Sequence, residues 1–329
     1  MNLKSVEVFD IRLMVTGGLG FIGSNFINYW LKNHPEDRIL NVDKCTYAAN
    51  FANIDKHLSE RNYEFVKEDI CNRERMLQLS KDIDIIVNFA AESHVDNSIS
   101  NSSEFLRSNY FGVYSLLEAA RVHNIRIHQV STDEVFGSLT MESNAIFNED
   151  TKYDPKNPYS ATKAAADHLV RAYVNTYGIK ATISNCSNNF GPNQHEEKLI
   201  PKTISLALKG KKIPIYGTGK NIRDWIYVED HCSGIEAVLT RGRLGESYLI
   251  GARNERTNIE VVNLILDHLN VSKDQIEFVE DRKGHDFRYS IDPSKIEKEL
   301  GWKPAYGFDK ALSLTIEYYK KRLKLPNRG

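Results

Sequence analysis

The sequence has few of the features that mark membrane, secreted or nucleic-acid-binding proteins. Its 329 residues hold no apolar run near the ~20 residues that cross a bilayer. The first ten residues contain acids where a signal peptide has an apolar segment, so no signal peptide is expected. Lys and Arg number 43 against 44 Asp and Glu, which leaves no net positive charge to attract nucleic acid. We expect a globular protein with a small-molecule substrate, and neither nucleic acid nor membrane as a partner.

Cysteine is also scarce. Four cysteines lie far apart without a Cys-x-x-Cys pair, so reduced thiols and a cytoplasmic location are expected. No His/Cys cluster and no His-Glu-x-x-His pattern is present. The sequence therefore predicts no metal site.

Short apolar runs alternate with helix-length segments through the first 190 residues. Strands are expected at 12–15, 38–43, 63–66, 83–89, 127–132 and 181–184, and helices at 21–32, 104–123 and 157–177. Strands that alternate with helices build parallel sheets covered on both faces. The sequence therefore predicts an α/β fold with a Rossmann-type doubly wound parallel sheet.

A glycine-rich turn follows the first expected strand. Gly17, Gly20 and Gly23 are three residues apart at the start of a helix, where glycines let the backbone approach a pyrophosphate. The same spacing also occurs in purely structural turns. Asp43 ends the second strand twenty residues after Gly23, and an acid there accepts ribose hydroxyls and repels a 2′-phosphate. The pattern favours binding of NAD over NADP.

The second half of the chain is less regular. Helices are expected at 258–270 and 307–320, among clusters of glycine, proline and basic residues. We predict an NAD-binding Rossmann domain at 1–190 and a smaller C-terminal α/β substrate-binding lobe at 191–329. Some segments of this lobe are expected to return to the first domain.

Two groups of residues suggest acid–base chemistry. Tyr159 and Lys163 share one helix face, where the ammonium lowers the phenol pKa so that a tyrosinate can take a hydroxyl proton. Such a pair is common by chance. Asp133 and Glu134 follow the strand at 127–132, at the edge where open α/β sheets bind ligands. They could serve as separate acid and base, or begin a solvated loop.

Taken together, these segments resemble the extended short-chain dehydrogenase/reductase family, and within it the nucleotide-sugar dehydratases. Matching stretches lie at 16–24, 43–50, 88–96, 131–137, 159–163, 188–201, 223–230 and 281–292. The Thr-Asp-Glu triplet at 132–134 is the most specific of them. Sugar-nucleotide epimerases lack the acid pair, and mannose-type dehydratases and decarboxylases usually keep only the Glu.

The resemblance implies a lyase that converts dTDP-glucose to dTDP-4-keto-6-deoxyglucose with tightly bound NAD, for deoxysugar and polysaccharide biosynthesis. Tyr159, with Lys163, would take the proton of the sugar 4-hydroxyl, which Thr132 orients, while the C4 hydride passes to NAD. Glu134 would remove the C5 proton, and a protonated Asp133 would protonate the leaving 6-hydroxyl. The hydride would then return to C6.

The resemblance also implies two sets of binding residues. For NAD they are Gly17, Gly20, Phe21, Ile22, Gly23, Asp43, Lys44, Thr46, Asp69, Ile70, Ala90, Ala91, Ser93, Ser108, Tyr159, Lys163 and Asn189. For the nucleotide sugar they are Ser93, Thr132, Asn188, Lys198, Leu199, Pro214, Ile215, Tyr216, Arg223, Asn258, Asp281, Arg282 and His285. Arginine and histidine suit a diphosphate because they donate charged hydrogen bonds.

Departures from the family pattern lie in the substrate lobe, at Asn193, His195, Glu196, Lys283 and Phe287. The sequence does not distinguish thymine from uracil, because one methyl group is worth only about 1–3 kcal/mol in a pocket. A 4,6-dehydratase of UDP-glucose or another nucleotide sugar, or a 4-epimerase, remains an alternative. A noncatalytic NAD-binding regulatory protein is a further alternative, which the intact Tyr/Lys pair argues against.

A homodimer is also expected. Members of the family pair two helices across a two-fold axis into a four-helix bundle. The helices expected at 104–123 and 157–177 carry apolar residues for such a contact, namely Tyr110, Tyr114, Leu117, Ala164, Leu169 and Tyr173. The alternative is that these side chains cover the sheet of their own subunit.

Overall fold

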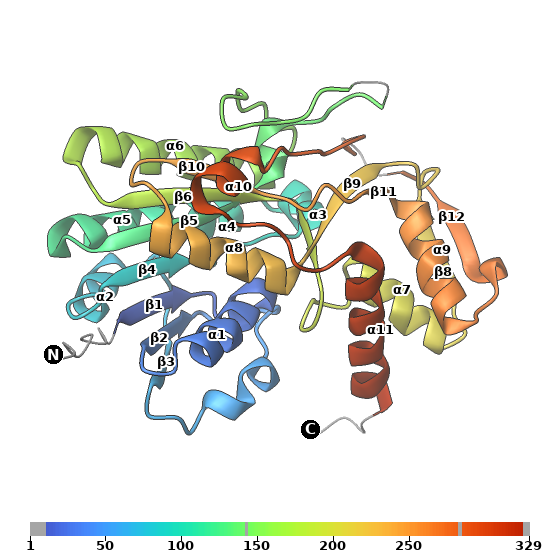
Figure 1. Ribbon diagram of the computed structural model, residues 1–329, viewed down its shortest axis with the longest axis horizontal. Coiled ribbons are helices and arrows are strands. Elements are labelled where there is room, and N and C mark those ends of the chain that lie inside the picture. The colour runs from blue at the N-terminus through green and yellow to red at the C-terminus, as the bar shows by residue number, and fades with distance from the viewer. Residues whose placement is uncertain (1–10, 142–143, 282–284, 325–329) are drawn as a thin grey trace, which may run out of the picture.

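A seven-stranded parallel sheet forms the centre of the computed structural model, which describes residues 11–141, 144–281 and 285–324 (Figure 1). Its strands are β1 (Arg12–Thr16), β2 (Arg38–Asp43), β3 (Tyr63–Lys67), β4 (Ile85–Asn88), β5 (Arg126–Thr132), β6 (Ala181–Cys186) and β10 (Ser247–Ile250). The strand order is β10-β6-β5-β4-β1-β2-β3. The order reverses between β1 and β4, and ligands of such sheets bind at the carboxyl ends of the strands there. The expected doubly wound fold is confirmed.

Helices cover both faces of this sheet. One face packs against α1 (Phe21–Asn33), α8 (Val228–Arg241) and α10 (Ser294–Leu300), and the other against α2 (Arg73–Leu79), α5 (Gly112–His123) and α6 (Pro158–Tyr177). Successive strand residues point to opposite faces. Leu13 and Val15 of β1 accordingly join the first core, and Met14 joins the second. The apolar runs of the sequence are continuous because both faces are buried.

Most element boundaries lie within a few residues of the expected ones. The helix expected at 104–123 is divided into α4 (Ser103–Leu106), a π-helical turn at Arg107–Phe111, and α5. The sequence analysis did not predict α8 or β10. Both return to the large sheet from the second half of the chain.

Helix α3 (Val95–Ser100) follows β4 and contacts α6. The remaining helices and strands form a smaller group at one side of the sheet, on the right in Figure 1. It contains the sheets β11-β9-β7 and β12-β8. The elements are β7 (Asn188–Phe190), β8 (Ile213–Tyr216), β9 (Ile222–Tyr227), β11 (Glu255–Thr257), β12 (Ile276–Val279), α7 (Leu199–Leu208), α9 (Asn258–Leu269) and α11 (Phe308–Lys324). The division of the chain at residue 190 stays a prediction. Among the described residues, no helix has the length and apolar character that crossing a membrane requires.

Candidate active site

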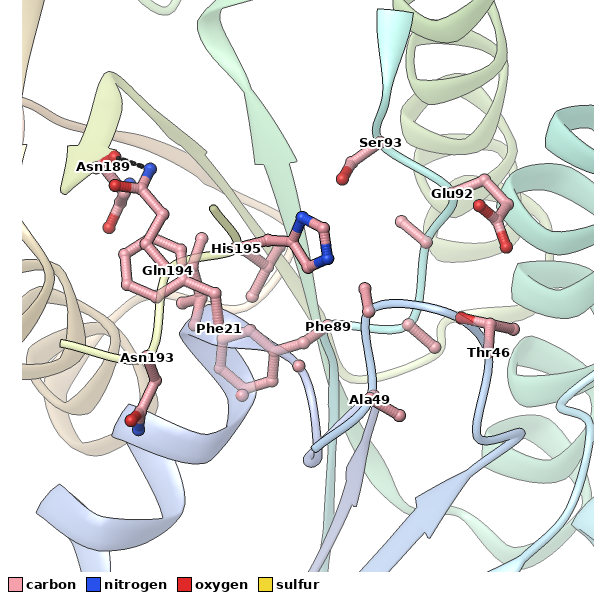
Figure 2. A pocket seen from close by; sticks show the side chains of 18 of the residues that line it. Phe21, Thr46, Ala49, Phe89, Glu92, Ser93, Asn189, Asn193, Gln194 and His195 are labelled. Atoms are coloured by element: carbon pink, nitrogen blue, oxygen red, sulfur yellow. Dashed lines mark hydrogen bonds between the residues drawn. The ribbon is translucent and has the colours of Figure 1, made fainter. Parts of the chain in front are cut away.

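A cavity of about 660 Å³ opens at the carboxyl ends of β1, β2, β4, β5 and β6. Figure 2 shows Thr46 and Ala49 from the segment after β2, Glu92 and Ser93 from the segment after β4, and His195 from the loop after β7. All the residues expected to bind NAD line this cavity. The part of the chain that the structure describes contains no group of three or more His, Cys, Asp or Glu side chains arranged for a metal ion.

At one end of the cavity, the backbone of the glycine turn lies close to the backbone of the segment after β4 and to the first turn of α1. Gly17 has a φ of +71°, and a Cβ there would lie 2.7 Å from the backbone nitrogen of Ala90. A Cβ on Gly23 would lie 2.4 Å from the carbonyl oxygen of Gly17. Helix α1 begins at Phe21 after Gly20, which has no side chain to cap the first N–H groups. The N-terminus of α1 is therefore open to a pyrophosphate.

Asp43 lies at the end of β2 and is nearly buried. Its Oδ2 accepts a hydrogen bond from the Leu19 N–H at 3.0 Å, and its Oδ1 accepts one from the Cys45 N–H at 2.8 Å. Burial raises the pKa of Asp43, and these two N–H donors lower it. Each carboxylate oxygen can accept a second hydrogen bond. A ribose hydroxyl fits that remaining capacity, so the residues present suit NAD.

The loop after β7 crosses the mouth of the cavity. Gln194 Nε2 donates to the Asn189 carbonyl at 2.9 Å (Figure 2). The ring of His195 packs edge to face on the ring of Tyr47, with 5.8 Å between the ring centroids. Helix α11 holds this loop from behind, because the Tyr319 hydroxyl donates to the Gln194 carbonyl at 2.5 Å. The departures at Asn193 and His195 thus lie in a loop that has its own packing partners.

The residues expected to bind the nucleotide sugar are only partly brought together. Ser93, Thr132, Asn188 and Lys198 line the cavity. The side chains outside its lining are Leu199, Pro214, Ile215, Tyr216, Arg223, Asn258, Asp281 and His285, whereas Arg282 and Lys283 lie outside the described residues. Ile215 is buried in an apolar core with Val262 and Leu266 of α9. Its side chain faces that core because alternate residues of β8 point in opposite directions.

The triplet at the end of β5 places two acids in different surroundings. Thr132 Oγ1 donates to Asp133 Oδ1 and accepts from the Glu134 N–H, both at 3.3 Å. Asp133 is 2% exposed, and its Oδ2 has no hydrogen-bond partner in the described part of the chain. Burial, with the nearby Glu134, raises the pKa of Asp133 well above its usual range. This shift favours the protonated form of Asp133.

Glu134 is half-buried beside the same cavity. Burial raises its pKa, but the positive charges of Lys198 and Arg223 lower it. Two adjacent carboxyl groups with different pKa shifts can act as an acid and a base in one reaction.

Tyr159 and Lys163 lie one turn apart near the start of α6. The helix start is fixed by Asn157, whose Oδ1 accepts from the Ser160 N–H at 2.9 Å. Lys163 Nζ donates to the Val130 carbonyl at 2.7 Å. The expectation that Lys163 lowers the pKa of Tyr159 stays a prediction. Burial raises that pKa well above its usual range, since a phenolate would lie in a dry site beside Glu134, and burial lowers the pKa of Lys163.

Arg223 lies behind the acid pair, together with two residues that sequence reasoning missed. Its guanidinium stacks 4.3 Å above the ring of Tyr289 and donates to the Asp286 carbonyl at 3.0 Å. Its charge acts on both Asp133 and Glu134. No spacing signal connects Tyr289 and Asp286 to the triplet, because the contact depends on the fold of the second lobe.

Two more buried polar residues support the site and were also missed. Asp167 Oδ2 accepts from the hydroxyls of Ser131 at 2.7 Å and Tyr153 at 3.0 Å. Its position four residues after Lys163 was a readable signal, because that spacing places both on one helix face. Asn109, in the π-helical turn, donates to Thr162 Oγ1 at 3.0 Å and accepts from the Glu92 N–H at 2.8 Å. It ties the segment after β4 to α6.

Known proteins resemble the chain over most of its length. A family model described as GDP-mannose 4,6 dehydratase matches residues 14–315. A dTDP-glucose 4,6-dehydratase of Mycobacterium tuberculosis is 47% identical over 311 residues, which cover 94% of this chain and 93% of that protein.

Solved structures agree in fold. DesIV, a dTDP-glucose 4,6-dehydratase from Streptomyces venezuelae whose structure has NAD bound, matches with a TM-score of 0.92 and 42% identity, covering 94% of this chain and 97% of that one. A UDP-glucose 4-epimerase from Thermotoga maritima matches with a TM-score of 0.88 and 24% identity, covering 95% of this chain and 100% of that one. The likeness to the epimerase shows the fold alone. The fold is therefore shared by dehydratases and epimerases and does not by itself distinguish the two activities.

Proposed function

Because this chain belongs to the GDP-mannose 4,6-dehydratase family and is an NAD-dependent nucleotide-sugar dehydratase of the dTDP-glucose 4,6-dehydratase type, we propose that its residues 132–134, 159 and 163 carry out the conversion of dTDP-glucose to dTDP-4-keto-6-deoxyglucose. The observation that carries this assignment is the acid pair at the end of β5, in which Asp133 is buried and Glu134 is half-buried. An oxidation at C4 needs one base, whereas the loss of water across C5 and C6 needs a further acid and base.

The cavity supports the cofactor part of the proposal. When bound, NAD supplies a hydride acceptor and a positive charge beside Tyr159. The glycine turn and the N-terminus of α1 would hold the pyrophosphate, and Asp43 would hold a ribose. Ser93, Lys198 and Asn188 would hold the sugar side of the cavity.

The acid–base roles follow from the surroundings of each group. Tyr159 acts as a tyrosinate and takes the proton of the sugar 4-hydroxyl. Burial raises the pKa of its phenol, and the positive charge that bound NAD would supply opposes that shift. Glu134, with Lys198 and Arg223 near it, removes and returns the proton at C5. Asp133, kept protonated by burial, gives its proton to the departing 6-hydroxyl. The Lys163 ammonium is held by its hydrogen bond to the carbonyl of Val130, two residues before the triplet in β5.

The decisive test compares substrates. Purified protein is incubated separately with dTDP-glucose and UDP-glucose, and the 4-keto-6-deoxy product is measured by mass spectrometry. We expect product from dTDP-glucose. Product from UDP-glucose alone would assign a uridine nucleotide to the substrate. Formation of a C4 epimer would indicate the epimerase alternative. Retention of NAD without consumption of either sugar would indicate a regulatory protein.

A homodimer through α5 and α6 is also proposed. Leu117 and Tyr173 are buried in the core of their own subunit and are not free for a partner. Three other side chains are free for a partner. Phe111, at the end of the π-helical turn before α5, is 57% exposed, Val122 of α5 is 54% exposed, and Tyr177 at the end of α6 is 55% exposed. Light scattering should give twice the mass of 37.6 kDa for the unsubstituted protein and a monomer for Phe111→Glu. A monomeric mass for the unsubstituted protein would rule the dimer out.

A cytoplasmic location is proposed from the thiols. Cys45, Cys71, Cys186 and Cys232 are all free, and unpaired thiols suit a reducing compartment. Cell fractionation followed by immunoblotting tests this directly.

A further inference from the structure

The proposed reaction, on which this inference rests, shifts one proton within the protein at each turnover. Tyr159 gains a proton when the O–H bond of the 4-hydroxyl breaks. Asp133 loses one when the C6–O bond breaks and water leaves. Glu134 takes a proton from C5 and gives one back, so it ends unchanged. The two electrons that leave C4 with the hydride return at C6, so no outside oxidant is needed. The protein therefore ends with Tyr159 protonated and Asp133 ionised, the reverse of its starting state.

The Thr132 hydroxyl lies between these two groups. It donates to Asp133 Oδ1 at 3.3 Å, and it is also the side-chain hydrogen-bond partner of Tyr159. Tyr159 and Thr132 are each 8% exposed and Asp133 is 2% exposed, so bulk water is largely excluded from the three. Asp133 Oδ2 has no partner among the described residues and is left for the leaving hydroxyl.

Other titratable groups near Tyr159 and Asp133 have their own hydrogen-bond partners or roles in the reaction. Lys163 Nζ donates to the Val130 carbonyl at 2.7 Å, and the Cys186 thiol donates to the Ser131 carbonyl at 3.4 Å. Asp224 accepts from the backbone N–H groups of Ala252 and Asn254. Glu134 faces both Tyr159 and Asp133, Arg223 faces Asp133, and Lys198 and Arg223 lie near Glu134, which the reaction uses at C5.

We propose that Thr132 resets the active site by relaying the proton from Tyr159 to Asp133. The Thr132 O–H bond breaks as its hydrogen moves to Asp133 Oδ1, and a new O–H bond forms as Thr132 takes the hydrogen of Tyr159. One O–H bond is lost at Tyr159 and one is gained at Asp133, while Thr132 is regenerated. The proton removed from the sugar 4-hydroxyl thus replaces the one that leaves in water, and the cycle closes without exchange with solvent.

The test separates the first turnover from later ones. NAD-loaded Thr132→Val and Thr132→Ser are mixed with excess dTDP-glucose, and product per site is followed by rapid quench. Thr132→Val lacks the hydroxyl and should form about one product per site, followed by turnover slower than the first on the order of 100-fold. Thr132→Ser keeps a hydroxyl, so the ratio of later to first turnover should stay near that of the unsubstituted protein. Thr240→Val, an exposed position on α8, is the matched control and should leave both rates unchanged.

A second readout does not depend on rates. Difference infrared spectra taken after one turnover should show loss of the protonated-carboxyl band in Thr132→Val and recovery of the band in the unsubstituted protein. Asp133→Asn identifies the band. If Thr132→Val disturbs the fold, Thr132→Ala provides the same comparison.

Three outcomes would overturn the relay. The first is equal slowing of the first and later turnovers in Thr132→Val, which means that Thr132 only orients the 4-hydroxyl. The second is a carboxyl band that recovers equally fast in every variant, which means that solvent resets the pair. The third is loss of multiple turnover in Thr132→Ser together with Thr132→Val. Failure of the unsubstituted protein to consume any sugar would instead refute the proposed function.

Discussion

At the scale of single residues, the two acids after β5 have the same functional group but different surroundings. Asp133 is buried, and one of its oxygens has no partner among the described residues, whereas Glu134 is half-buried and has the Lys198 ammonium near it. The charge of Arg223 acts on both acids. Burial in a dry site favours the neutral form of a carboxyl, and nearby cations favour the ionised form. The division into acid and base is therefore set by neighbours that are distant in the sequence.

This division predicts which step each substitution stops. Asp133→Asn keeps the shape of the side chain but has no proton to give, so reduced nicotinamide should accumulate, seen by its absorbance, while product formation falls roughly 100- to 10,000-fold. Tyr159→Phe should prevent the reduced nicotinamide from appearing. If Asp133→Asn turns over normally while Tyr159→Phe is inactive, the reaction is epimerase-like at C4. Losses of only two- or three-fold in both would mean that neither residue takes part.

At the scale of elements, helix α6 aligns three functional groups. Tyr159, Lys163 and Asp167 are spaced by four residues and lie on one face. Asp167 is fully buried, and its negative charge raises the pKa of Lys163, which burial lowers. The helix thus places a carboxyl group one turn away from the lysine, where its charge acts on the ammonium.

Removal of that charge should change the pH dependence of the reaction. Asp167→Asn retains an acceptor for Ser131 but loses the negative charge, so the pKa of Lys163 should fall further. The ammonium would then be lost at a lower pH, and the alkaline limb of kcat against pH should move to lower pH. Asp154→Asn, at an exposed position before α6, is the control and should leave the profile in place. A change in kcat at every pH with no movement of the limb would assign Asp167 a purely structural role.

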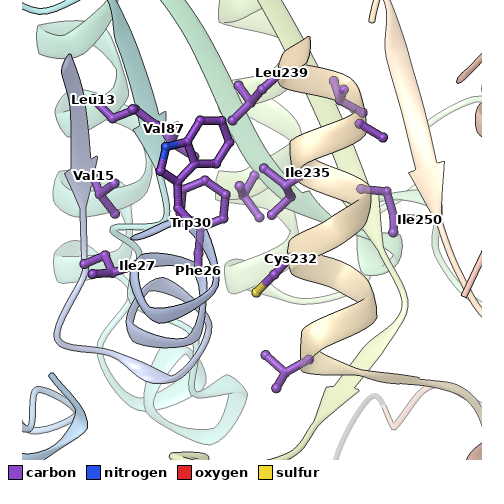
Figure 3. Close-up of a cluster of buried hydrophobic side chains, with 14 of the residues drawn as sticks. Leu13, Val15, Phe26, Ile27, Trp30, Val87, Cys232, Ile235, Leu239 and Ile250 are labelled. Carbon is purple, nitrogen blue, oxygen red and sulfur yellow. The ribbon is translucent and has the colours of Figure 1, made fainter. Parts of the chain in front are cut away.

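The packing of α1 against α8 shows how two distant helices share one core (Figure 3). Phe26 and Trp30 of α1 are 0% and 1% exposed and lie in one cluster with Ile235 and Leu239 of α8. Truncation of a buried phenylalanine typically costs about 3–5 kcal/mol. Phe26→Ala should lower the free energy of unfolding in urea by that amount. Phe278→Ala, at a position 59% exposed on β12, should cost below about 1 kcal/mol. Equal costs at the two positions would contradict this core.

At the scale of the whole molecule, the last helix closes the cavity that the first strands build. Tyr318 donates to Asn193 Oδ1 at 2.6 Å, and Tyr319 donates to the Gln194 carbonyl at 2.5 Å. Both contacts join α11 to the loop that covers the cavity. We expect α11 to contribute to the retention of NAD, although its sequence carries no cofactor motif.

Tyr319→Phe tests this contribution. The substitution removes the hydroxyl that donates to the carbonyls of Gln194 and Gly191. A buried hydrogen bond is worth about 0.5–1.5 kcal/mol, so the dissociation rate of NAD should increase roughly two- to tenfold. The rate is measured by the loss of bound NAD after dilution. Tyr177→Phe removes a hydroxyl from an exposed ring on α6 and should leave the rate unchanged. An unaltered rate in Tyr319→Phe would show that α11 does not hold the loop closed.

Local patterns in the sequence were sufficient for the first half of the fold and for much of the cofactor site. The apolar runs predict strands β1 to β6, because burial on both faces of a parallel sheet leaves such runs continuous, and apolar residues at helical spacing predict α1. The turn at Gly17 needs glycine because a side chain would collide with Ala90, and Asp43 is placed by the end of its strand. Tyr159, Lys163 and the triplet at 132–134 are short-range patterns of the same kind.

The tertiary structure alone decided what depends on contacts between distant segments. β10 has only four residues, and its place beside β6 follows from pairing across the sheet. Burial in the assembled site raises the pKa of Tyr159, and Ile215 lies in an apolar core. Tyr289 and Asp286 reach the acid pair only because β9 brings Arg223 to them. Desolvation and charge depend on three-dimensional neighbours, so residue type and spacing determined which groups are present, and packing determined their protonation and their contacts.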